Sequence, residues 1–395
     1  MNARLFAGMK WVPVLLDREA GPADRPSPAR RPLFAVSRVH LEALSTGLGL
    51  WQHARGAKPD PRFGYCTDDV ARSIVVDVMQ SRELGWAAVD PSVRRSLLFL
   101  RAAFNRASGR FLNFRDADGR WLDAGASEDC HARAIAALAA VMVELPGTEL
   151  ADGARDLFCE ALPAAMSFGA MRAISAALMA CDSVCRAGLA SEAQPAFDQL
   201  ATHLVLTFGD PAAEWPWPEP ILTYENAVVP HSLIAAGLRL DQPALLATGC
   251  SVLDWLIDVQ VGDSGQFSPI GNKRWWRRGD ERSRFDQQPI EAAALMSAAA
   301  AAFRATGRGR YLEAAEAAYG WFLGDNDLGV PLANPATGGC HDGLTPDGPN
   351  ENQGAESTLM WLIALEEMRE LRRSTGSDLK PVVVAEPQRD AAPRP

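Results

Sequence analysis

The sequence predicts an all-α fold in which six helical hairpins close into a ring, an (α/α)6 toroid with short β-hairpins in its loops. Apolar residues recur at helical spacing along most of the chain, as in Ala71, Ile74, Val75 and Val78. Long polar and aromatic loops precede helices near residues 69, 129, 168, 225, 287 and 354, and short turns join each of these helices to the next. This alternation is typical of antiparallel helical hairpins whose long loops all lie at one end.

An open helical solenoid is the alternative to the closed ring. Solenoid repeats have a nearly constant period and similar short loops. The long loops of this chain are individual in sequence and unequally spaced, which favours the toroid. We expect helices near 33–53, 69–83, 91–106, 129–145, 150–166, 168–187, 191–208, 225–239, 241–260, 287–305, 308–324 and 354–373. Strand signals are confined to short pieces such as 110–114 and 266–270.

The composition indicates one globular domain, predicted over residues 33–373, between a flexible segment (1–32) and a disordered tail (374–395). A net charge of −10 argues against a nucleic-acid partner, because phosphate binding needs a basic face. The chain has no uninterrupted apolar run of the length that crosses a membrane. The seven cysteines form no CxxC pair, which is typical of reduced thiols, and no signal peptide is evident at the N-terminus. We therefore expect a cytoplasmic protein.

A recurring phrase opens the six helices that follow the long loops. Each phrase ends a Gly-, Trp- or Asp-rich loop, and most carry clustered carboxylates and amides. The phrases are YCTDDVAR (65–72), ASEDCHAR (126–133), FGAMRAIS (168–175), LTYENAVVP (222–230), FDQQPIEAA (285–293) and NENQGAEST (350–358). Any single carboxylate here has a structural explanation as a helix cap, because free N–H groups and the helix dipole stabilise it.

Aromatic residues in the same loops favour a binding role for the whole set. Aromatic rings stack on the C–H faces of sugars, while carboxylates and amides bond sugar hydroxyls. Packing over the helix ends is the alternative for each ring. The predicted substrate-binding residues are Tyr65, Asp68, Arg72, Glu128, His131, Trp215, Trp217, Tyr224, Asn226, Trp275, Trp276, Gln287, Asn352 and Gln353.

Several loop phrases resemble a bacterial, glycosyltransferase-associated family of the six-hairpin glycosidase-like group. They are YCTDDVAR, WPWPEPILTYENA, SPIGNKRWWRRGDERSRFDQQPIEAA and GGCHDGLTPDGPNENQGAEST, and the resemblance covers about residues 33–370. It implies an (α/α)6 barrel and work on carbohydrate, with a glycosyltransferase as a possible functional partner. The resemblance does not identify a catalytic pair of residues.

Known six-hairpin glycosidases carry their catalytic carboxylates at the mouths of the inner helices. The corresponding candidates here are Asp69, Asp129, Glu225, Asp286 and Glu351. Hydrolysis of a glycosidic bond needs one group to protonate the leaving oxygen and another to act as base or nucleophile. We expect an inverting hydrolase that uses Asp69 and Asp129, with no metal and no cofactor.

Other activities remain open from the sequence. Sugar 2-epimerases on this fold use histidines as acid and base, and His131, His231 and His341 lie at or near helix mouths. A non-catalytic glycan-binding partner of a glycosyltransferase would keep a polar, aromatic-lined cup at the helix mouths without an acid–base pair. Zinc on Cys66, Cys130, Cys340, His131 and His341 has no supporting ligand spacing, and calcium at Asp342–Glu351 lacks the alternating acidic pattern. The basic stretch Lys273–Arg284 could pair with other loops or hold an anionic sugar.

Overall fold

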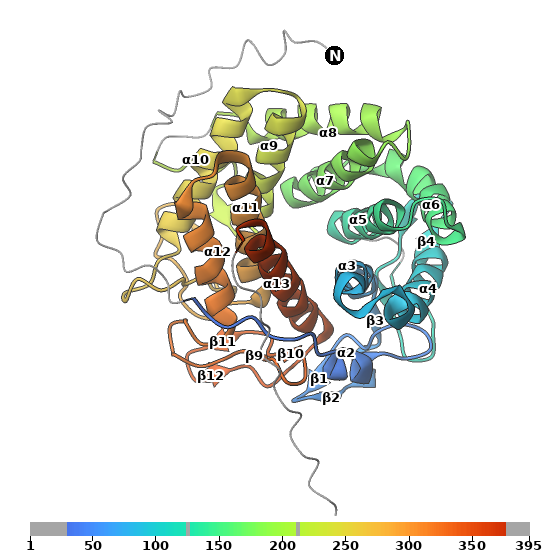
Figure 1. The fold of residues 1–395 in the computed structure, drawn as a ribbon, viewed down its shortest axis with the longest axis horizontal. Coiled ribbons are helices and arrows are strands. Elements are labelled where there is room, and N and C mark those ends of the chain that lie inside the picture. Colours follow the sequence, from blue (N-terminus) through green and yellow to red (C-terminus); the bar gives the residue numbers. More distant parts are fainter. Residues whose placement is uncertain (1–29, 124–126, 211–213, 377–395) are drawn as a thin grey trace, which may run out of the picture.

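The computed structural model describes residues 30–123, 127–210 and 214–376 (Figure 1). The segments predicted to be flexible, 1–32 and 374–395, lie outside the described residues except at their inner ends. At those ends, Arg31 makes an ion pair with Asp325, and the last helix continues to Ser374. The packed part of the chain thus begins a little before residue 33.

Six inner helices form a closed ring. Each packs against the next, and the last packs against the first (Figure 1). They are α3 (Thr67–Leu84), α5 (Glu128–Glu144), α7 (Met171–Ala187), α9 (Val228–Arg239), α11 (Pro289–Thr306) and α13 (Ala355–Ser374). Contact between α13 and α3 excludes an open solenoid and confirms the predicted toroid.

Outer helices pack behind the inner ring. Each follows its inner partner after a short turn and contacts it. They are α4 (Trp86–Ala103), α6 (Glu149–Ala165), α8 (Ala193–Phe208), α10 (Pro243–Val259) and α12 (Gly309–Phe322). The short helix α2 (Val39–Leu44) packs against α13, so the two ends of the barrel domain complete the sixth hairpin.

The prediction of a long helix over 33–53 is wrong for most of that range. After Leu44 the chain turns, and Ser45 and Leu50 form a β-bridge. Gly49 lies against Phe99, where an added Cβ would be only 3.1 Å from the ring. This close crossing leaves little room for a side chain on an irregular backbone.

The inner helices are rich in small apolar residues because they are covered on nearly every side. In α11 the fully buried positions include Ala292, Ala298 and Ala299. Helices that are apolar all round are typical of buried positions. Ser127 is the N-cap of the inner helix α5, and its side chain accepts a hydrogen bond from the backbone of Cys130. Its first turn thereby fixes the position of the neighbouring polar residues.

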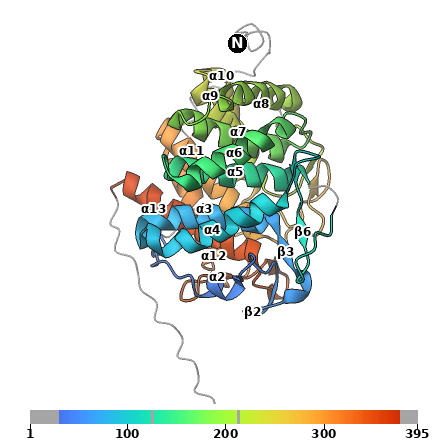
Figure 2. The same cartoon turned by 90° about the vertical axis from the view of Figure 1, so that its right-hand side faces the viewer.

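Short β-pairs connect the long loops. The six pairs are β1 (Ala54–Arg55) with β2 (Lys58–Pro59), β3 (Tyr65–Cys66) with β6 (Phe114–Arg115), β4 (Phe104–Asn105) with β5 (Arg110–Phe111), β7 (Ile221–Leu222) with β8 (Trp276–Arg277), β9 (Ala333–Asn334) with β10 (Gly339–Cys340), and β11 (Leu344–Thr345) with β12 (Gly348–Pro349). The pairs β3–β6 and β7–β8 join loops that belong to different helical hairpins. Figure 2 shows β3 and β6 together at one end of the helices.

Side-chain contacts place all six inner-helix mouths on one rim, as predicted. Arg133 of α5 bonds Asp68 of α3 and Glu225 in the loop before α9. Arg172 of α7 bonds Asn226, and Asn226 bonds Glu291 of α11. The mouths of α3, α11 and α13 share a pocket. None of the described helices is both long and apolar enough to cross a bilayer.

Candidate active site

A pocket of about 240 Å³ lies at the mouths of α3, α11 and α13. Polar side chains dominate its wall, and one aromatic ring borders it. Its lining includes Asp68, Asp69, Arg72, Asp342, Glu356, His53 and Phe114. Several carboxylates around one arginine are typical of a site for acid–base chemistry.

Asp69 is a buried carboxyl group in the first turn of α3. Its side chain is only 4% exposed, and its Oδ1 accepts a hydrogen bond from Arg72 Nη1 at 3.2 Å. Burial raises the pKa of Asp69 to about 8, despite the opposing effect of Arg72, and the nearby carboxylates of Glu356 and Asp68 add to the rise. At neutral pH Asp69 is therefore protonated, and its contact with Arg72 is a hydrogen bond to a neutral acid.

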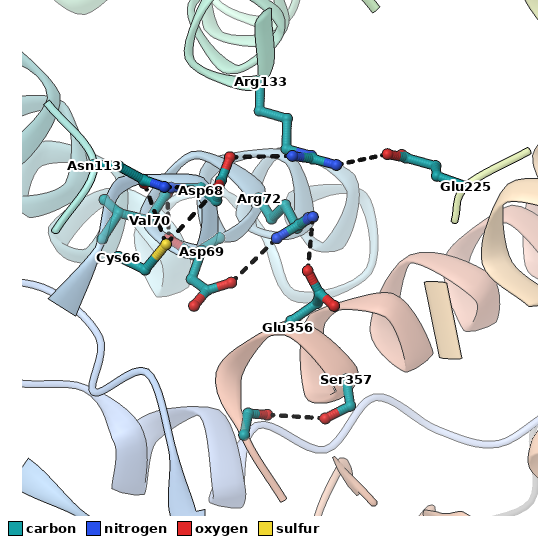
Figure 3. A network of polar contacts seen from close by, with 12 residues as sticks. Cys66, Asp68, Asp69, Val70, Arg72, Asn113, Arg133, Glu225, Glu356 and Ser357 are labelled. Atoms are coloured by element: carbon teal, nitrogen blue, oxygen red, sulfur yellow. Dashed lines mark hydrogen bonds and ion pairs between the residues drawn. The ribbon is translucent and has the colours of Figure 1, made fainter. Parts of the chain in front are cut away.

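Glu356 lies on the other side of the same arginine. Arg72 Nη2 is 2.9 Å from Glu356 Oε2, so one guanidinium holds both carboxyl groups at the pocket (Figure 3). The side chain of Glu356 is 44% exposed, in contrast to the buried Asp69. The pocket thus presents a protonated acid and an ion-paired carboxylate side by side.

Asp68 faces away from Asp69 toward a second arginine. Arg133 bridges Asp68 at 3.2 Å and Glu225 at 2.6 Å, and Asn113 donates a hydrogen bond to Asp68 at 3.1 Å (Figure 3). Burial raises the pKa of Asp68, but Arg133, Arg72 and Asn113 outweigh it, and the net pKa is lowered. Consecutive aspartates therefore carry opposite protonation states at neutral pH.

Asp342 closes the pocket from the loop before α13. Its carboxylate accepts hydrogen bonds from Ser357, Asn352 and the backbone N–H of Gly354. Burial raises the pKa of Asp342. Because its two oxygens are both engaged by these donors, Asp342 holds the first turn of α13, and with it Glu356, in position.

A second polar cluster lies further round the rim, at the mouths of α7, α9 and α11. Arg172 donates to Asn226 at 3.1 Å and pairs with Glu219 at 3.2 Å. Asn226 in turn donates to the buried Glu291 at 3.1 Å. Burial raises the pKa of Glu291 to about 7. These bonds tie three helix mouths together.

The remaining catalytic candidates lie apart from the pocket wall. Asp129 accepts a hydrogen bond from the Tyr224 hydroxyl on the neighbouring part of the rim. Asp286 has a left-handed backbone, with φ of 66°, and Glu351 is exposed. Neither these residues nor Glu225 are among the described residues that line the pocket. Asp69 is the one member of the predicted set that lines it.

Four predicted sugar ligands make structural contacts instead. Glu128 accepts from the backbone N–H groups of Gly169 and Ala170 at 2.9 and 2.7 Å, immediately before α7. The side chain of Gln287 is fully buried and bonded to Asp327 and Trp321. Asn352 bonds the backbone of Ala54 and the carboxylate of Asp342, and the neighbouring Gln353 accepts through its carbonyl from His40.

The predicted sugar-binding role of the loop aromatics is wrong for this pocket, which they do not line. Tyr65 is buried and stacks on Trp51 with ring centroids 4.5 Å apart. Trp215 and Trp217 are 5% and 2% exposed and belong to the hydrophobic core. Burial of such large rings stabilises the fold, so these residues pack in the core although they lie in loops.

The second tryptophan pair also packs on the protein. Trp276 contacts Trp215 and Trp255, and its Nε1 donates to the carbonyl of Asp280. Trp275 Nε1 donates to Asn272. Neither ring is among the described residues that line the pocket. The surrounding basic loop is paired with other loops, since Arg278 contacts Glu214 and Arg284 contacts Asp327.

The histidines proposed for epimerisation do not line the pocket either. His131 is fully buried, lies between Phe111 and Phe168, and bonds the carbonyl of Ala161 at 3.0 Å. Burial lowers the pKa of His131 and of His231 to about 4. His341 bonds the carbonyl of Asn350 outside the pocket. His53 lines the pocket, where it contacts Asn352 at 2.7 Å.

The thiols of the mouth loops are buried. Burial raises the pKa of Cys66, Cys130 and Cys340. Within residues 30–123, 127–210 and 214–376, no three His, Cys, Asp or Glu side chains are arranged to hold a metal ion.

Sequence reasoning missed several pocket residues, among them His53, Phe114 and Glu356, and it considered Asp342 only for a calcium site. Glu356 could have been found. It is the acidic residue in the first turn of α13, whereas the chosen Glu351 precedes the helix by several residues. Phe114, His53 and Asp342 reach the pocket through loop folding, for which the local sequence has no comparable signal.

Several solved protein structures are similar to the structure of this chain. No protein-family model and no curated protein matches the sequence. A cellobiose 2-epimerase from Spirochaeta thermophila is similar in structure, with a TM-score of 0.63 and 15% identity over 83% of this chain and 91% of that one. A D-mannose isomerase has a TM-score of 0.63 and 11% identity over 84% and 93% of the two chains.

A glycoside hydrolase shares the fold as well. A GH76 α-mannanase from Bacteroides thetaiotaomicron has a TM-score of 0.58 and 8% identity over 86% of this chain and 94% of its own. These similarities show that the chain shares the (α/α)6 fold of these proteins. The fold expected from the resemblance in the loop phrases is confirmed.

Proposed function

We propose that this protein is a glycoside hydrolase that acts on an oligosaccharide at the pocket of α3, α11 and α13. The observation that carries the proposal is the pairing of a protonated Asp69 with an ion-paired Glu356 on one guanidinium. Carboxyl groups whose environments separate their protonation states are typical of acid–base pairs. Structural neighbours that include a mannanase support carbohydrate as the substrate class.

Asp69 is the general acid in this proposal. Its proton passes to the leaving glycosidic oxygen as the bond to the anomeric carbon breaks. Glu356 is the base: it takes a proton from a water molecule whose oxygen attacks the anomeric carbon. Glu356 replaces Asp129 as the partner of Asp69, because Asp129 is bonded to Tyr224 away from the pocket wall.

Sugar epimerisation is the second candidate. Similarity to a cellobiose 2-epimerase and a mannose isomerase supports it as much as similarity to the mannanase supports hydrolysis. His53 is the histidine that an epimerase could use as a base, since His131, His231 and His341 do not line the pocket. The paired carboxyl groups favour the hydrolase. A non-catalytic glycan-binding role beside a glycosyltransferase stays a prediction, as does the cytoplasmic location.

The pH dependence of turnover tests the role of Asp69. A general acid works only while it holds its proton, and the pKa of Asp69 is about 8. We therefore expect kcat/KM to fall as the pH rises from neutrality through about 8. Steady-state hydrolysis of neutral oligosaccharides across this range measures the effect. A kcat/KM that rises through the same range would assign the acid elsewhere.

A further inference from the structure

The pocket has room for one sugar ring. Its volume of about 240 Å³ lies below the ~300–1,000 Å³ of pockets that enclose drug-sized ligands. An oligosaccharide therefore places one terminal ring inside and leaves its remaining rings over the rim. The side chains at that rim decide which oligosaccharides can bind.

Two exposed aromatic rings stand at the opening. Phe114 borders the pocket and is 42% exposed. Phe63 is 52% exposed and packs edge-on against His53, which also lines the pocket, with ring centroids 4.6 Å apart. Exposed rings at the edge of a polar pocket are typical of binding surfaces.

The position of Phe114 is fixed by its backbone. Phe114 is paired with Cys66 across β3 and β6, directly before α3. Its N–H donates to Asp123 Oδ1 at 2.9 Å, and the adjacent Asn113 N–H donates to Asp123 Oδ2 at 2.8 Å. The ring is thus presented by a tethered strand, which reduces the entropy lost when a ligand stacks on it.

The charges of the pocket disfavour an acidic sugar. Asp68, Asp342 and Glu356 contribute carboxylates to its wall, and Asp69 contributes a protonated carboxyl group. Arg72 is the cation among the described lining residues, and its two terminal nitrogens already contact Asp69 and Glu356. A uronic acid ring would bring another carboxylate to this wall without an unoccupied guanidinium to receive it.

Resting on the proposed function, we infer that the substrate is an oligosaccharide whose terminal sugar carries no acidic group. That sugar enters the pocket, and the next ring stacks on Phe114. The protein then acts from the end of a chain rather than in its middle. Phe114 is a specificity-determining residue that contacts substrate without taking part in proton transfer.

Calorimetry on the inactive Asp69→Asn protein tests this inference with defined probes. These probes are glucose, mannose, cellotriose, mannotriose and trigalacturonate. We expect a neutral trisaccharide to bind at least about tenfold more tightly than trigalacturonate. When Phe114→Ala is combined with Asp69→Asn, trisaccharide binding should weaken about tenfold. Monosaccharide binding should stay unchanged within about twofold. Leu98→Ala, which alters an exposed residue on the outer helix α4, is the matched control and should change neither.

Three results would overturn the inference: trigalacturonate binding as tightly as the neutral probes, a Phe114→Ala effect no larger than that of Leu98→Ala, or no binding of either neutral trisaccharide at millimolar concentration. A different result would contradict the proposed function and leave the binding inference intact. If wild-type protein binds a neutral trisaccharide with the expected dependence on Phe114 but does not hydrolyse it, the binding inference stands and the hydrolase assignment falls.

Discussion

Replacing Asp69 with Asn is expected to reduce turnover by about a hundred- to ten-thousand-fold, the usual contribution of a general acid. The fold should be preserved, because Asp69 is already neutral at pH 7 and Asn has nearly the same shape. Glu356→Gln should produce a loss of similar size by removing the base. Steady-state kinetics on a neutral oligosaccharide, with circular dichroism for folding, measures both variants.

Glu313→Gln is the matched control for these substitutions. Glu313 is exposed on the outer helix α12 and is not among the described residues that line the pocket, so its replacement should leave turnover unchanged. If Asp69→Asn and Glu356→Gln retain the activity of Glu313→Gln, neither residue is the acid or the base. Asp129, Glu225, Asp286 and Glu351 would then be the carboxylates to replace.

Arg133→Met is expected to lower the free energy of unfolding by about 3 kcal/mol, the low end of the range for breaking a buried ion pair. The side chain of Arg133 is 13% exposed and holds Asp68 and Glu225, which are 16% and 23% exposed. Met keeps much of the aliphatic packing but leaves both carboxylates without their partner. Chemical denaturation followed by circular dichroism measures the change.

An exposed arginine provides the comparison. Arg106 pairs with Glu160 at 3.0 Å, with side chains 65% and 43% exposed. Arg106→Met should cost about 0–1 kcal/mol, the usual range for surface pairs. An equal cost for the two variants would mean that Arg133 does not link the mouths of α3 and α9.

The ring of helices could be predicted because it depends on local patterns. Apolar periodicity marks each helix, and the alternation of short turns with long loops marks which ends lie together. The exception at 45–53 arises from a contact between Gly49 and Phe99, residues far apart in sequence. Periodicity within a segment contains no information about such a crossing.

The pocket was predictable only in part, because loop folding decides which side chains converge. Asp69 was identified from its place at the mouth of α3. Asp342 and Phe114 reach the same pocket from the loops before α13 and α5. The tryptophans were predicted wrongly because Trp215 lies in a polar loop. Packing of its large ring on Trp255 and Trp276 stabilises the protein more than exposure in a sugar-binding cup would.

The measurement that tests the central claim most directly is the fate of water oxygen during turnover. Wild-type protein is incubated with neutral oligosaccharides in H2¹⁸O at pH 7, and the products are analysed by mass spectrometry at early times. Hydrolysis by Asp69 and Glu356 predicts shorter products that carry one ¹⁸O at the new anomeric carbon. These products should be absent from the Asp69→Asn reaction. Conversion to an isomer of unchanged length without early ¹⁸O incorporation would contradict the account and establish epimerisation instead.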